Sequence, residues 1–108
     1  MSRSNGDAVA GVDAGFAPDH DGARWSYLGP LNFANAAPVL AATTEVALPG
    51  EGEVDLDNMR AIDSSAVAVL VALKRRAEEE RKPLRFIHAP AALLALADVY
   101  GVGPILDS

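Results

Sequence analysis

The sequence contains no cysteine, and this absence excludes disulfides, thiol catalysis and thiolate metal sites. Basic residues are also few: nine Lys and Arg stand against fifteen Asp and Glu, and the net charge at pH 7 is −6. This charge argues against nucleic acid or an anionic membrane surface as the main partner. No apolar run approaches the length of a membrane span, and the first residues do not read as a secretory signal. We therefore expect a cytoplasmic protein without direct membrane insertion.

The length of 108 residues suffices for one domain with one hydrophobic core. Residues 1–22 are rich in Ser, Gly, Asp and Ala, a composition that buries little surface, so they are predicted to form a mobile N-terminal tail. The apolar residues between 9 and 16 allow an edge strand there as the alternative. The domain itself is predicted to span residues 23–108.

A strand followed by a long helix is predicted at the centre of the chain. Residues 54–57 alternate between apolar and acidic side chains, the period of a half-buried strand. After them, apolar side chains recur at helical spacing and predict a helix to about Arg81, because Pro83 disfavours helical angles in the residue before it. The side chains of this stripe are Ala66, Val69, Leu70, Leu73 and Ala77. Basic residues 74–76 precede acidic residues 78–80 by four positions, which predicts a solvated helix end with ion pairs.

The other elements follow from similar signals. They are a strand at 24–28, a short helix after Asn35, a strand at 84–88, and a last helix between Pro90 and Gly101. Strands that alternate with helices imply parallel pairing through right-handed crossovers. The alternation at 54–57 indicates that one face of the sheet is less covered than the other. The predicted fold is therefore a single α/β domain with a small, mostly parallel sheet and helices mainly on one face.

Three polar residues, Asp63, Ser64 and Ser65, open the long helix. Their oxygens can accept hydrogen bonds from the unpaired backbone N–H groups of the first turn, so helix capping alone accounts for the pattern. A hydroxyl at this place is also exposed near the positive end of the helix, where it can carry or contact a phosphate. Capping and binding are both compatible with the sequence.

The order and spacing of these pieces resemble the STAS domain, the family of sulfate-transporter tails and anti-sigma-factor antagonists. The resemblance covers roughly residues 24–106. It is carried by residues 28–36, 54–57, 62–66, 67–73, 83–87 and 99–102. It implies a small mixed sheet with helices packed on one side.

Two branches of the family are compatible with the Asp-Ser-Ser motif. The MlaB-type branch, which the chain resembles more, contains the accessory subunit of the ABC transporter that maintains outer-membrane lipid asymmetry. There the hydroxyl residue directly after the Asp is important, and it corresponds to Ser64. In anti-sigma-factor antagonists the second serine of Asp-Ser-Ser-Gly is phosphorylated, which corresponds to Ser65, although Ala66 stands here in place of the glycine. Both serines are therefore candidates for phosphorylation.

The resemblance implies a non-catalytic subunit that docks on the cytoplasmic ATPase of a phospholipid-transporting ABC system and supports its assembly or activity. Such a subunit is cytoplasmic and reaches the inner membrane through its partner. The alternative is an anti-sigma-factor antagonist, whose partner is an anti-sigma factor kinase and whose binding is switched by serine phosphorylation.

Val67 and Val71 lie beside the core stripe of the long helix. They belong either to a wide buried face or to an apolar patch near Ser64 that receives a partner's helix. The predicted partner-binding residues are Asp63, Ser64, Ser65, Val67 and Val71. The sequence has no Gly-x-Ser-x-Gly elbow, calcium loop or phosphate-binding glycine loop, and His88 reads as the end of a strand. We expect no catalysis, cofactor or metal.

Overall fold

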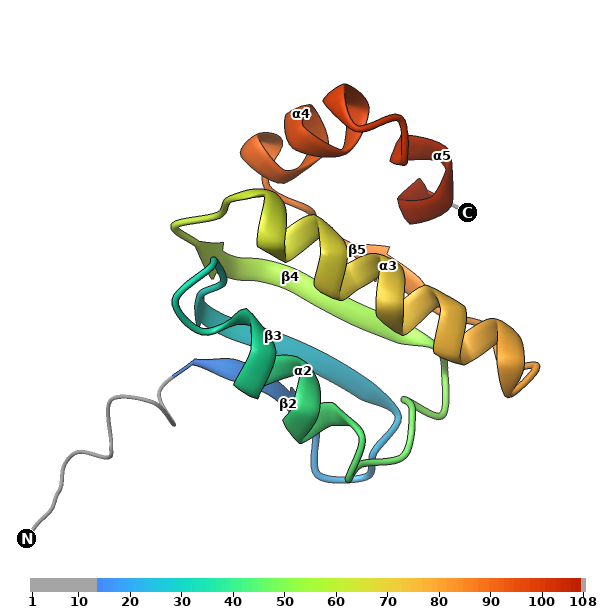
Figure 1. Ribbon diagram of the computed structural model, residues 1–108. Coiled ribbons are helices and arrows are strands. Elements are labelled where there is room, and N and C mark those ends of the chain that lie inside the picture. The colour runs from blue at the N-terminus through green and yellow to red at the C-terminus, as the bar shows by residue number, and fades with distance from the viewer. Residues whose placement is uncertain (1–13, 108) are drawn as a thin grey trace, which may run out of the picture.

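The computed structural model describes residues 14–107, and Figure 1 shows its strands and helices. In chain order the elements are β2 (Gly15–Pro18), β3 (Arg24–Pro30), α2 (Ala36–Thr43), β4 (Glu53–Arg60), α3 (Ser64–Glu79), β5 (Arg85–Ile87), α4 (Ala91–Val99) and α5 (Gly103–Asp107). The predicted alternation of three strands and three helices is confirmed. β2 and the short α5 are additions to it. Most of the predicted tail, residues 1–13, lies outside the described residues.

The four strands form one sheet in the order β2-β3-β4-β5. β3, β4 and β5 pair in parallel, and β2 pairs antiparallel with β3. Parallel neighbours require a crossover between them, which α2 and α3 supply. The predicted small, mostly parallel sheet is therefore confirmed. Among residues 14–107, no helix combines the length and apolar composition needed to cross a membrane.

The two faces of the sheet differ in cover, as predicted. Figure 1 shows α2 and α3 lying across one face, while α4 and α5 lie beyond the β5 edge. On the covered side Trp25 and Val54 stand next to each other in the register and are fully buried. One position earlier in both strands, Arg24 faces Glu53 with Nε and Oε1 3.0 Å apart. Charged side chains thus occupy the face that the helices leave open.

The edge strand β2 corrects one prediction. For residues 15–18 a mobile tail is wrong, because they form an edge strand. The alternative edge strand between residues 9 and 16 overlaps it only at residues 15 and 16, and residues 9–13 lie outside the described residues. The Phe16 ring packs edge-on against Tyr27, with 4.6 Å between centroids, and lies 5.8 Å from the Trp25 ring. These contacts join positions nine and eleven residues apart through a hairpin, so local composition did not reveal them. The aromatic packing stabilises a strand that its Gly15 and Pro18 disfavour.

The predicted stripe of α3 is buried throughout, and it forms the centre of the core. The stripe belongs to one buried cluster with side chains of the sheet, the loops and the other helices, and two of its members, Leu70 and Leu73, are among the largest fully buried side chains of the protein. These large side chains are Trp25, Tyr27, Leu31, Leu56, Leu70, Leu73, Leu93 and Val54. Helical periodicity therefore identified the core face of α3 correctly.

Lys74 departs from the predicted solvated helix end. Its side chain is 7% exposed, and its ammonium group donates to the backbone carbonyl of Leu84 and lies 5.6 Å from the centroid of the Phe86 ring. Burial lowers the pKa of Lys74, and the nearby Glu78 carboxylate partly offsets this effect. For Lys74 the prediction is wrong, because the chain after Pro83 returns over this side of α3 and covers it.

Arg76 follows the prediction and adds a structural role. Its Nε lies 2.8 Å from the Glu80 carboxylate, the expected pair four residues apart. The other two guanidinium nitrogens donate to the carbonyl oxygens of Thr43 and Val46, each at 2.8 Å. Arg76 therefore ties the last turns of α3 to the end of α2.

Candidate partner-binding site

The carboxylate of Asp63 organises the start of α3. Asp63 is the N-cap residue, in an extended conformation, and its Oδ1 accepts from the backbone N–H of Ser65 at 2.8 Å. Its Oδ2 accepts from the backbone N–H of Phe33 at 3.0 Å. The bond from Phe33, followed by those from Ser65, lowers the pKa of Asp63. Asp63 thus caps the helix as predicted and also holds the loop between β3 and α2.

The two serines of the motif have different environments. Ser64, the first residue of α3, is exposed. Ser65 is half-buried, and both its backbone N–H and its hydroxyl bond to the Asp63 carboxylate. Ser64 therefore offers a free surface to a partner, whereas Ser65 is engaged in capping. This distinction could not be drawn from the sequence, where both positions suit a first turn.

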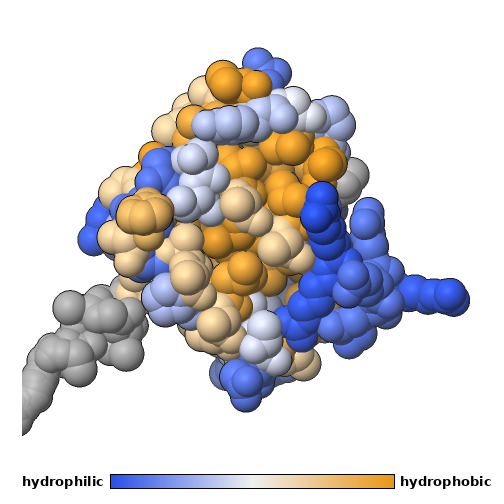
Figure 2. Space-filling model, viewed as in Figure 1, coloured by the Kyte–Doolittle hydropathy of each residue, from blue (hydrophilic) through white to orange (hydrophobic). Residues whose placement is uncertain are grey.

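An apolar groove of about 520 Å³ runs along the outer side of α3 from Ser64. Its lining consists of Ser64, Val67, Ala68, Val71, Ala72, Arg75, Arg76, Glu79, Tyr100 and Val102. Figure 2 shows apolar side chains gathered over this part of the molecule, bordered by strongly hydrophilic ones where α3 ends. Val67 is buried and Val71 is half-buried. The two alternatives, a wide buried face and an apolar patch near Ser64, therefore both apply. Both valines border the core and line a surface groove.

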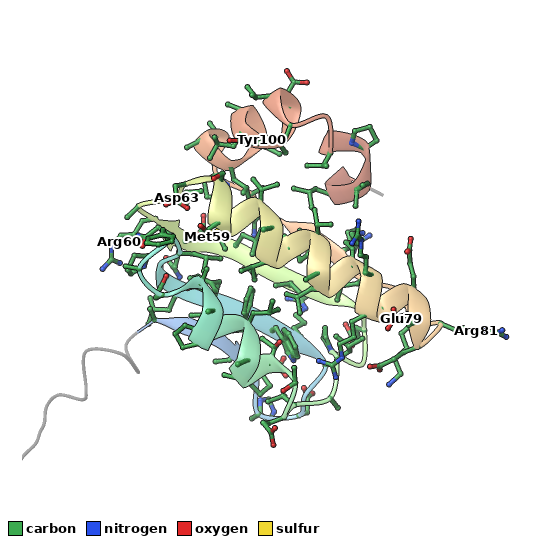
Figure 3. All side chains as sticks on the ribbon, viewed as in Figure 1. Met59, Arg60, Asp63, Glu79, Arg81 and Tyr100 are labelled. Carbon is green, nitrogen blue, oxygen red and sulfur yellow. The ribbon has the colours of Figure 1, made fainter. Side chains whose placement is uncertain are left out.

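The end of α4 forms the second wall of this groove. Tyr100, which directly follows α4, is 57% exposed, and its neighbour Val99 is 76% exposed. Figure 3 shows Tyr100 close to the end of α3 at which Asp63 lies. Sequence reasoning did not place Tyr100 in the site. The signal was available, since a large aromatic directly before a helix-ending glycine lies at a helix end.

Phe33 is an exposed aromatic residue that the sequence analysis did not connect with the motif at residues 63–65. Its side chain is 86% exposed, and the bond from its backbone N–H to Asp63 places it beside the start of α3. The partner carboxylate is thirty residues away in the chain, so no local pattern could join the two. A loop aromatic outside any periodic stripe was the one available signal.

The remaining candidate chemistry concerns His88 and the acidic side chains. His88 pairs with Asp55, with Nδ1 and Oδ1 3.1 Å apart, rather than with a serine of the motif. Within residues 14–107, no cluster of three or more His, Asp and Glu side chains is placed to hold a metal ion. The chemistry that the site supports is non-covalent contact: an exposed hydroxyl, a cap and an apolar groove.

Comparisons with known proteins agree with this architecture. A family model described as "Mlab, STAS domain" matches residues 28–107. The matched region begins within β3 and includes all of α3, α4 and the groove between them. A comparison with curated proteins finds no match.

Proposed function

The chain belongs to the STAS domain family, in its MlaB type, and from that premise we propose a non-catalytic binding subunit of a phospholipid-transporting ABC system. In this proposal the protein docks on the cytoplasmic ATPase, supports its assembly or activity, and reaches the inner membrane through it. The observation that carries the proposal is the apolar groove that begins at the exposed Ser64. An exposed apolar groove in an otherwise charged surface is typical of an interaction site.

The dimensions of the groove favour a helix as its occupant. α3 has sixteen residues, so the groove follows an axis of about 24 Å, which accommodates about four turns of a second helix. Beside the two valines the groove is lined by Ala68 and Ala72, and such small residues let a second helix axis approach to about 8–10 Å. An amphipathic helix of the ATPase would lay its apolar side here.

The two ends of the groove would orient such a helix. At one end, the Ser64 hydroxyl can donate or accept a hydrogen bond, and a partner that buries it without one would lose affinity. At the other end Arg75 and Glu79 present charges of opposite sign. These polar ends flank an apolar centre, the arrangement in which a few placed polar groups set register and specificity.

A partner-switching regulator is the second candidate function, and the hydroxyls at the start of α3 favour it. The backbone N–H groups of a helix N-terminus stabilise a phosphate, so a phosphoserine would be tolerated there. In this case the partner is an anti-sigma factor kinase, and Ser65 or Ser64 carries the phosphate.

The test is an affinity pull-down of the tagged protein from its own cells, with mass spectrometry of its partners and of both serines. We expect recovery of the ABC ATPase with unmodified serines, and loss of the ATPase with Ser64→Arg, which places a large charge at the head of the groove. Ser26→Arg is the matched control, because Ser26 is also exposed but lies on β3. If Ser64→Arg co-purifies the ATPase at wild-type yield, the site is misassigned. Recovery of a small kinase with phosphate on Ser65 would establish the second candidate instead.

A further inference from the structure

Phe33 is the most exposed large hydrophobic side chain among residues 14–107, at 86%. It does not belong to the core cluster, whereas the other two phenylalanines, Phe16 and Phe86, pack against that cluster. A phenyl ring left in water is unfavourable, and its burial against a partner is correspondingly favourable. The fold therefore presents an apolar group that it does not use for its own stability.

The backbone that carries this ring is held in place. The Phe33 N–H bonds to Asp63 at 3.0 Å, and the side-chain amide of Asn32 donates to the Ala61 carbonyl at 2.9 Å. The Asn32 N–H donates to Oδ1 of Asn35 at 3.0 Å. These bonds join the loop to the turn before α3 and to the start of α2. Little backbone entropy would be lost when the ring is buried, as in a preorganised binding loop.

The backbone of Phe33 is joined to the start of the groove through Asp63, although Phe33 belongs to a different element. Asp63, which holds the Phe33 backbone, directly precedes Ser64, the first residue of the groove lining. Figure 1 shows α2 and α4 on opposite sides of α3. The loop that enters α2 and the Tyr100 end of α4 thus flank the start of α3. A partner seated on the groove near Ser64 would meet both.

We propose that Phe33 is an aromatic anchor of this docking surface and that its ring enters an apolar pocket on the ATPase. The inference rests on the proposed function and names a contact of the same interface. Because Asp63 connects the Phe33 loop to the start of the groove, the same partner, rather than a second one, is expected to contact both. A bilayer fits less well, because interfacial anchors combine several apolar residues with basic ones. Here the neighbours of Phe33 are Asn32 and Ala34, and the net charge is −6.

The test measures the dissociation constant of the purified full-length protein for the purified ATPase encoded in the same genome. We expect Phe33→Ala to weaken binding at least about tenfold, as for a central aromatic anchor, and Phe33→Trp to stay within about threefold of wild type. Leu28→Ala is the matched control, because Leu28 is 55% exposed on β3, and its affinity should be unchanged. The thermal midpoints of all three variants should equal that of the wild type, since neither replaced side chain is in the core.

The outcomes separate this inference from the proposed function. If Phe33→Ala binds within twofold of wild type while Ser64→Arg does not bind, the anchor is wrong and the groove stands. If the wild-type protein does not bind the ATPase, both fail. If the wild type floats with vesicles of phosphatidylethanolamine and phosphatidylglycerol, and Phe33→Ala does not, the ring contacts lipid and the anchor proposal is overturned.

Discussion

Asp63 accepts the backbone N–H of Phe33 at 3.0 Å, although thirty residues separate them. The same carboxylate accepts the Ser65 N–H at 2.8 Å, so one side chain joins the loop before α2 to the first turn of α3. A helix cap usually acts on its own helix alone. Here the cap also fixes the loop that presents an exposed ring beside the candidate site.

Replacement of Asp63 by Ala should therefore affect stability and binding together. Both hydrogen bonds are lost, so we expect the thermal midpoint at pH 7 to fall by a few degrees and the ATPase affinity to fall as the Phe33 loop loosens. The pKa of Asp63 is lowered in the folded state. Its stabilising contribution is thus present above the unfolded pKa, about 3.9, and is lost as the pH falls through the lower folded pKa.

Thermal unfolding of wild type and Asp63→Ala between pH 2 and pH 7 checks this prediction. The difference between the two midpoints should be largest near neutral pH and should shrink in acid. Asp98→Ala is the control, since Asp98 is exposed on α4. Equal midpoints for wild type and Asp63→Ala at pH 7 would show that the double contact does not stabilise the fold.

The apolar centre of the groove can be tested without touching the core. Ala68 is exposed and lines the groove, so Ala68→Glu should leave the thermal midpoint nearly unchanged. The added carboxylate would lose its hydration against an apolar partner, and we expect binding to the ATPase to weaken at least about tenfold. Ala95→Glu places the same charge on an exposed position of α4 outside the groove lining and should bind normally. Equal affinities of the two variants would exclude the groove as the docking surface.

The parts of the fold that the sequence predicted are those set by local periodicity. Apolar side chains recur at helical spacing in α3 and at every second residue in the strand at 54–57. The sequence therefore identified both elements and their buried faces. The motif at residues 63–65 was found because capping residues directly precede that stripe. An apolar patch beside it was one of two alternatives for Val67 and Val71, which lie next to the stripe, and a wide buried face was the other.

The remaining features depend on contacts between distant segments. β2 forms because Phe16 reaches Trp25 and Tyr27 across a hairpin, although its own four residues, Gly-Phe-Ala-Pro, show no strand pattern. Lys74 is buried because the chain after Pro83 brings a carbonyl acceptor over it. Neither the pairing of an edge strand nor the position of a returning loop is encoded in a local window. The position of Phe33 also depends on a contact between distant segments, the hydrogen bond from its backbone N–H to Asp63.

Tyr27 should make stability depend on alkaline pH. Its hydroxyl donates to the Pro30 carbonyl at 2.7 Å, and burial raises its pKa to about 12. A folded pKa above the unfolded value, about 10, gives stability that is present below pH 10 and is lost as the pH rises through 12. Tyr27→Phe should therefore lose about 0.5–1.5 kcal/mol at pH 7, and its deficit relative to wild type should shrink above pH 10.

Urea unfolding of wild type and Tyr27→Phe from pH 7 to pH 11.5 measures this deficit. The carbonyl of Pro30 also accepts from the Asn35 side-chain amide at 2.8 Å, so the variant does not leave it without a donor. This places the expected loss in the lower part of the range. A deficit that stays constant across the whole pH series would contradict the link to Tyr27 ionisation.

Gly52 and Gly50 form a matched pair in the loop before β4. Gly52 has φ +75°, and a Cβ on it would lie 2.8 Å from the carbonyl oxygen of Pro83. The Gly52 carbonyl also accepts from the Arg85 N–H at 2.6 Å, so the loop cannot move without disturbing the start of β5. Gly52→Ala combines left-handed strain with a backbone clash, and we expect the free energy of unfolding to fall by about 2–4 kcal/mol.

Gly50 is the control position. At Gly50 the nearest atoms are 3.8 Å from a Cβ, and Gly50→Ala should change the free energy of unfolding by less than about 0.5 kcal/mol. Urea unfolding of the two variants decides the point, because equal losses would mean that loop flexibility, and not the Gly52 conformation, sets the cost.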